Sequence, residues 1–94
     1  MATNIKSWLN ELREDYNEVE RELRKKEMLL EFQYVKVDHA HLVRDKLITD
    51  LYNQYKLEFQ SLQAEVSALE AKSVDLELLI RHLETFQNNK LNYL

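Results

Sequence analysis

Neither glycine nor proline occurs anywhere in this chain of 94 residues. Glycine supplies the positive φ angles of tight turns and proline ends or kinks helices, so a chain without either has few ready turn signals. Glycine-dependent phosphate loops and nucleophile elbows are excluded for the same reason. Cysteine is absent too, which excludes disulfides and cysteine-ligated zinc. These absences favour an all-α chain built from long helix.

Apolar residues recur at alternating gaps of four and three positions, the heptad pattern of a coiled coil. One series covers residues 5–37 and a second covers 55–94. Polar residues interrupt the series at Lys26, Gln33, Ser73 and Gln87, where they either specify the register or are tolerated near solvent. The predicted oligomer interface comprises Ile5, Leu9, Leu12, Tyr16, Val19, Leu23, Leu30, Val37, Ile48, Tyr55, Phe59, Leu62, Val66, Leu69, Leu76, Ile80 and Leu83.

The two series are out of phase by one residue, and the step lies within residues 37–59. The preferred interpretation is one continuous helix that passes through a stutter of eleven-residue repeats. The alternative is a helical hairpin or bundle that turns near residues 35–39. There, two β-branched valines lower helix propensity and Asp38 can cap a second helix. Because that stretch contains no glycine, proline or asparagine, the continuous helix ranks first.

A single helix of this length would be about 140 Å long and would have no core of its own. Its apolar stripe would need a partner chain, so the sequence predicts a homo-oligomer, a dimer or tetramer, and a further protein partner. A parallel dimer would oppose the like charges of Asp15 and Glu20, and also those of Glu22 and Glu27. The stripe also widens in places, as in bundles of three or four helices. Parallel and antiparallel arrangements both stay open.

Little in the chain is typical of an enzyme. Carboxylates are plentiful, but they fall on exposed helix faces, whereas acid–base catalysis needs a concave, partly desolvated site. His39 and His41 are two positions apart and point to different faces, so they cannot hold one metal together. We therefore predict no catalytic activity, no metal, no cofactor and no small-molecule substrate.

The sequence also bears on where the chain works. It has no run of 18 apolar residues that could span a membrane, and its start does not resemble a secretory signal. We expect an intracellular protein, cytoplasmic or nuclear. Since Leu94 continues the heptad series, residues 1–94 are predicted to be one oligomerisation segment from the N-terminal part of a longer chain.

The predicted function is an oligomerisation or scaffold segment that mediates protein–protein assembly. The alternative is a subunit of a hetero-oligomeric helical bundle that recruits a client through residues 28–59. A nucleic-acid-binding helix using residues 21–26 ranks last, because the net charge is −4 and glutamates interleave with the cations. The candidate docking residues are Arg21, Arg24, Lys25, Phe32, Tyr34 and Tyr52.

Overall fold

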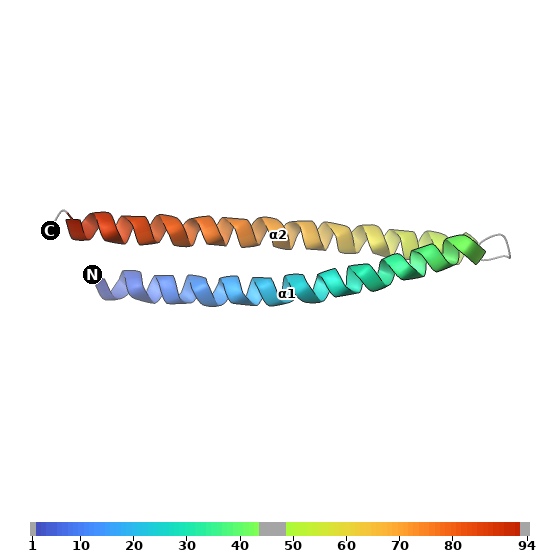
Figure 1. The fold of residues 1–94 in the computed structure, drawn as a ribbon, viewed down its shortest axis with the longest axis horizontal. Coiled ribbons are helices and arrows are strands. Elements are labelled where there is room, and N and C mark those ends of the chain that lie inside the picture. Colours follow the sequence, from blue (N-terminus) through green and yellow to red (C-terminus); the bar gives the residue numbers. More distant parts are fainter. Residues whose placement is uncertain (1, 44–48, 93–94) are drawn as a thin grey trace.

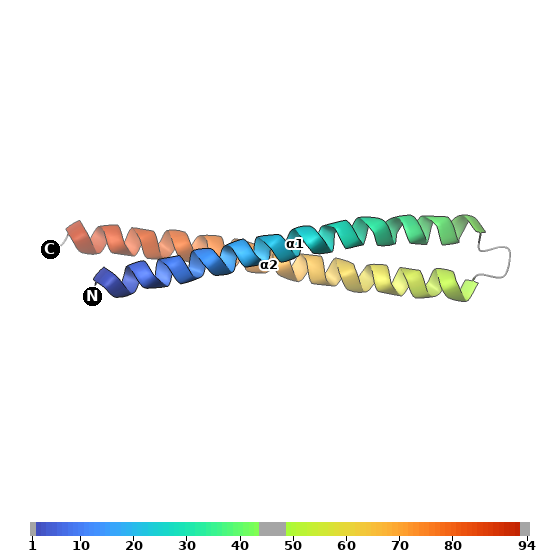
Figure 2. The same cartoon turned by 90° about the horizontal axis from the view of Figure 1, so that it is seen from below.

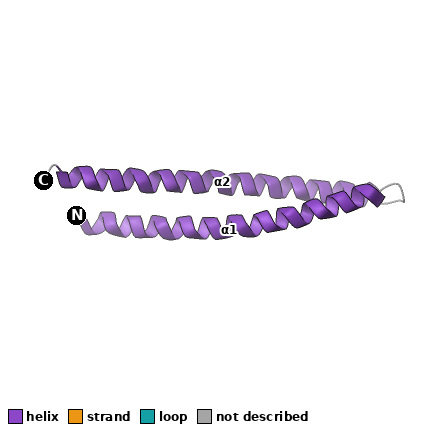
Figure 3. Cartoon of the chain, in the orientation of Figure 1, coloured by secondary structure: helices purple, strands orange, loops and turns teal. Residues whose placement is uncertain are grey.

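The computed structural model of the chain contains two long α-helices (Figure 1). Helix α1 is Ala2–Val43 and helix α2 is Thr49–Asn92. The structure describes the backbone of residues 2–43 and 49–92, and the side chains within 4–43 and 50–89. All of the described residues are helical, with no strand among them (Figure 3). The all-α prediction is therefore confirmed.

The two helices pack side by side in opposite directions, and the N- and C-terminal ends lie together at one end of the molecule (Figures 1 and 2). The molecule is a narrow rod with dimensions of 74 × 15 × 14 Å. Side-chain hydrogen bonds between the helices join Arg13 to Glu84, 71 residues apart, and Gln33 to Glu58, 25 residues apart. Separations that shrink toward the α1–α2 connection are those of an antiparallel hairpin.

The preferred interpretation of one continuous helix is wrong, and the hairpin alternative is right in kind. Its predicted position, residues 35–39, is also wrong, because those residues are helical within α1 and the chain reverses between Val43 and Thr49. β-branched residues cost a helix only a few tenths of a kcal/mol each, and half-burial of Val37 outweighs that cost. The conformational entropy lost in closing a short connection is small compared with the free energy gained when two long apolar stripes cover each other.

The phase step at residues 37–59 marks the change of helix and not a stutter. The heptads of α1 continue past Val37 to Ala40, which is buried. The heptads of α2 begin again at Tyr52, which is half-buried. Each helix needs a constant phase only along its own length, so the two series can differ by a residue.

The seam between the helices is made of the residues that the heptads single out. Every predicted interface residue that the structure describes is buried or half-buried, and Ile48 lies outside the described residues. The apolar stripes thus cover each other within one chain, so burying them requires no second copy. The most deeply buried of these side chains are Ile5, Leu9, Val19, Leu23, Val66 and Leu76.

Polar side chains in the seam bond across to the opposite helix. Gln33 is only 5% exposed. Its Nε2 group donates to the Tyr55 carbonyl oxygen at 3.0 Å and to Glu58 Oε2 at 3.1 Å. The Ser73 hydroxyl donates to a carboxylate oxygen of Glu20. Such bonds form only when the helices are aligned correctly, so these residues favour one register.

Charged and aromatic pairs along the edges of the seam support the same alignment. Lys26 Nζ lies 3.0 Å from Glu65 Oε2, and Arg13 Nη2 lies 3.1 Å from Glu84 Oε1. Two ring pairs also join the helices: Tyr34 with Phe59 at 6.0 Å between centroids, and His41 with Tyr52 at 5.7 Å. The antiparallel arrangement therefore places opposite charges across the seam, whereas a parallel dimer would oppose like charges.

Candidate protein-interaction surface

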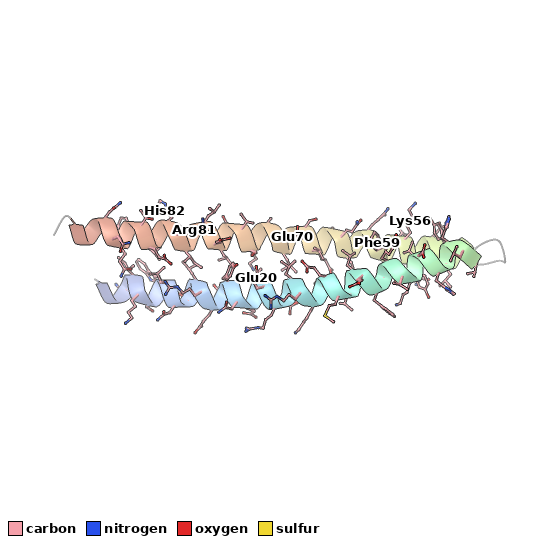
Figure 4. All side chains as sticks on the ribbon, viewed as in Figure 1. Glu20, Lys56, Phe59, Glu70, Arg81 and His82 are labelled. Atoms are coloured by element: carbon pink, nitrogen blue, oxygen red, sulfur yellow. The ribbon has the colours of Figure 1, made fainter. Side chains whose placement is uncertain are left out.

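A second set of apolar side chains lies outside the seam, on the half of α1 that leads to the chain reversal. Side chains project from the outer sides of both helices as well as into the seam (Figure 4). Among them, Met28 is 72% exposed, Phe32 is 58% exposed and Leu42 is 74% exposed. Met28, Phe32, Val35 and Leu42 follow each other at spacings of four, three and seven, so they share one side of the helix. Leu29, three residues before Phe32, lies at the edge of that side. We call this the α1 apolar surface: Met28, Leu29, Phe32, Val35 and Leu42.

Two lysines frame the centre of the α1 apolar surface. Lys25 lines a shallow open hollow together with Met28, Leu29 and Phe32. At the other end, Lys36 Nζ lies 4.7 Å from the centre of the Phe32 ring and 5.7 Å from that of Tyr55. A cation in this position interacts favourably with the ring faces and holds its charge beside the apolar side chains. The centre of the surface therefore combines apolar area with two positive charges.

An acidic groove runs along the same molecule, nearer the chain ends. Its floor consists of apolar seam residues, and its rim carries three carboxylates from α1 and one lysine from α2. A rim of this kind favours cationic groups, while the floor favours an apolar side chain. The residues that line the acidic groove are Asp15, Glu18, Val19, Glu22, Leu69, Lys72 and Leu76.

The structure separates the six predicted docking residues into two groups. Arg21, Arg24, Lys25 and Phe32 are exposed on α1. The rings of Tyr34 and Tyr52 contact rings of the opposite helix, and of these two Tyr34 remains 60% exposed while Tyr52 is half-buried.

The other members of the α1 apolar surface lie within residues 28–59, the range predicted to recruit a client, but the sequence analysis does not name them individually. The 4–3 spacing of Met28, Phe32 and Val35 is the signal that distinguishes them from the seam residues. The acidic groove had no such signal, because it depends on which residues of α2 lie beside α1.

The basic cluster at residues 21–26 divides in a similar way. Lys26 faces α2 and pairs with Glu65. The other cations, Arg21, Arg24 and Lys25, point to solvent and form no ion pair within the described part of the chain. The cluster therefore does not act as one continuous basic surface.

The described helices also bear on metal binding and membrane insertion. Within the described ranges, no three histidines, cysteines, aspartates or glutamates gather in a way that could hold a metal ion. Neither α1 nor α2 has a stretch apolar enough, over the length required, to cross a lipid bilayer.

Comparisons with known proteins do not point to a function. No protein-family model, curated protein or solved structure matches the chain. Any functional conclusion therefore depends on the geometry of the hairpin itself.

Proposed function

We propose that this chain is a protein-assembly module, an oligomerisation or scaffold element, and not an enzyme. The paired helices form a stiff spacer, and the α1 apolar surface docks another protein chain. In keeping with the sequence analysis, the proposal places the module inside the cell.

The observation that carries the proposal is the exposure of the α1 apolar surface. Folding covers the seam, yet Met28, Phe32 and Leu42 remain more than half exposed on one side of α1. Soluble monomers rarely leave a contiguous apolar patch of large side chains uncovered, and such patches commonly mark interfaces with other proteins. A helix that carries its own apolar residues at heptad spacing is the simplest shape to cover this surface.

The hairpin also supplies the stiffness that a scaffold needs. Each helix is more than 40 residues long, which is about 60 Å or more at 1.5 Å per residue. Side-chain bonds across the seam occur from Arg13 near one end to Gln33 in the second half of α1. Proteins docked at different points along the rod would therefore be held at a defined spacing.

Recruitment of a client protein through residues 28–59 is the second candidate. It is favoured by the position of the α1 apolar surface, which begins at Met28 and lies in the half of α1 nearest the chain reversal. The two candidates use the same surface and differ only in the identity of the chain that covers it.

Site-specific photo-cross-linking in living cells tests the proposal. A photoreactive phenylalanine analogue replaces Phe32 in one version of the chain and Ser67 in a matched control, because Ser67 is exposed and polar on α2. We expect a cross-linked protein product of defined mass from position 32 and little or none from position 67. The absence of any product at position 32, or equal products at both positions, would rule out docking through the α1 apolar surface.

A further inference from the structure

One row of residues along α1, all exposed except the half-buried Lys36, has opposite chemistry in its two halves. The row follows spacings of four and three, so its members share one face of the helix beside the seam. Its first half is acidic and lies along the acidic groove. Its second half combines two lysines with two apolar residues of the α1 apolar surface. We call these residues the face row: Glu11, Asp15, Glu18, Glu22, Lys25, Leu29, Phe32 and Lys36.

Among the described residues, no charged side chain of the face row pairs with an opposite charge, although Lys36 Nζ lies over the Phe32 and Tyr55 rings. None of its four carboxylates and neither of its lysines takes part in an ion pair or side-chain hydrogen bond among the described residues. By contrast, Arg13, Glu20 and Lys26, which lie at the seam or its other edge, all bond to α2. The contacts within the chain thus leave one face of α1 with a negatively charged half and a positively charged half.

We propose that the face row is the docking site for a second copy of this chain, packed in the opposite direction. Glu11 and Glu22 are eleven residues apart, and so are Lys25 and Lys36. Eleven residues are close to three helical turns, about 16 Å along the axis. In the antiparallel arrangement, Glu22 meets Lys25 of the second copy while Glu11 meets Lys36. A twofold axis across the middle of the rod repeats both pairs, so four ion pairs form at once.

The apolar residues of the row match the acidic groove in the same arrangement. Leu29 and Phe32 lie between the two lysines in the sequence, and Asp15 and Glu18, which line the acidic groove, lie between Glu11 and Glu22. In this register Leu29 of the second copy lies opposite Glu18 and its Phe32 lies opposite Asp15, on the α1 rim of the acidic groove and beside its apolar floor of Val19, Leu69 and Leu76. Two large side chains that are more than half exposed in the single chain, Leu29 at 51% and Phe32 at 58%, become covered in the dimer. Apolar burial supplies the affinity, and the framing charges set the orientation.

Two face rows packed in parallel would not form a closed dimer. This packing would match Glu11 with Lys25 and Glu22 with Lys36 only after a shift of fourteen residues, which leaves an unmatched half-row on each copy. Such head-to-tail contacts lead to open chains of molecules, whereas the antiparallel contact uses both halves of both rows. Charge complementarity therefore selects a closed dimer.

This inference rests on the proposed assembly function and names its partner. The test is the mass of the whole chain in solution, measured by light scattering and sedimentation from low-micromolar to near-millimolar concentrations. We expect twice the 11.4 kDa of a single chain at the higher concentrations. Reversal of the lysines, Lys25→Glu with Lys36→Glu, should raise the dimer Kd at least tenfold. Reversal of the glutamates, Glu11→Lys with Glu22→Lys, should have the same effect.

Mixing provides the decisive control. The lysine-reversed chain has an entirely acidic row, and the glutamate-reversed chain carries lysine at positions 11, 22, 25 and 36. We expect the two variants to form a heterodimer when mixed in equal amounts, although each alone dimerises at least tenfold more weakly than the unmodified chain. A matched variant with charges reversed elsewhere on α1, Glu14→Lys with Arg24→Glu, should dimerise as the unmodified chain does. Far-ultraviolet circular dichroism verifies that every variant remains helical.

Two results would overturn the inference. One is a monomer at every concentration, and the other is a dimer whose Kd is unaffected by the reversals or unrestored by mixing. Either result leaves the assembly function standing if Phe32 still cross-links a different protein in cells. Loss of cross-linking at Phe32 would instead remove the assembly function itself, so the two failures are distinguishable.

Discussion

Truncation of one buried leucine and of its exposed neighbour tests how the seam is built. Leu76 is 8% exposed and lies against α1, whereas Leu78, two residues along the same helix, is 57% exposed. Leu→Ala at a buried position costs about 2–5 kcal/mol, which combines lost apolar burial with the cavity left behind. Because Leu76 also borders the open acidic groove, its site can partly refill with solvent, and we expect about 2–3 kcal/mol.

The matched variant Leu78→Ala should change the free energy of unfolding by less than about 0.5 kcal/mol, as exposed substitutions usually do. Urea unfolding followed by far-ultraviolet circular dichroism gives both values, and repeating it at tenfold higher concentration separates any contribution from assembly. Equal costs for the two variants, or a larger cost for Leu78→Ala, would show that α2 presents a different face to α1 and would refute the described seam.

Two further substitutions test the polar contacts of the seam. Gln33→Leu should leave the free energy of unfolding unchanged or raise it by about 1 kcal/mol, since a buried polar residue favours one register at a cost in stability. A loss of about 2 kcal/mol or more in urea unfolding would show that the Gln33 bonds to Tyr55 and Glu58 are stabilising overall. Glu65→Gln should cost less than about 1 kcal/mol, because its ion pair with Lys26 is partly exposed, and the cost should shrink in high salt. A cost that is independent of salt in the same assay would count against an ion-pair contribution.

The helical faces could be predicted from the sequence because they depend on local spacing. A residue at a heptad position points toward the same side of its helix whatever covers that side, so Leu9, Val66 and Leu76 are buried, although within one chain and not at the predicted oligomer interface. The identity of the covering helix is a different question. Burial within a hairpin and burial between copies select the same residues, so periodicity cannot separate them.

The chain reversal was misplaced because turn signals were sought in residue types alone. No glycine or proline marks the segment between Val43 and Thr49. The phase step between Val37 and Phe59 was the usable signal, and it was assigned to a stutter. A change of helix explains the same step, since each helix needs only its own constant phase.

The candidate surface was only partly predictable. Phe32 was identified as a docking residue, and it is exposed beside two cations. Tyr34 and Tyr52 are predicted for the same role, and their rings also contact α2 and α1 respectively, because aromatic side chains at the edge of a seam can reach across it. Tyr34 nevertheless remains 60% exposed. The unpaired charges of the face row became recognisable only once the partners of Glu20 and Lys26 on α2 were known.

The distance between residues 13 and 84 within one chain tests the central claim that the chain folds back on itself. The natural chain has no cysteine, so Arg13→Cys with Glu84→Cys places spin labels at two defined sites. Labelled chains are diluted in excess unlabelled chain, so that only distances within a chain are measured by pulsed electron resonance. The hairpin predicts a short distance set by the label arms, since these side chains are 3.1 Å apart. A continuous helix would separate the sites by roughly 106 Å, and a short distance that disappears on dilution would equally contradict the hairpin.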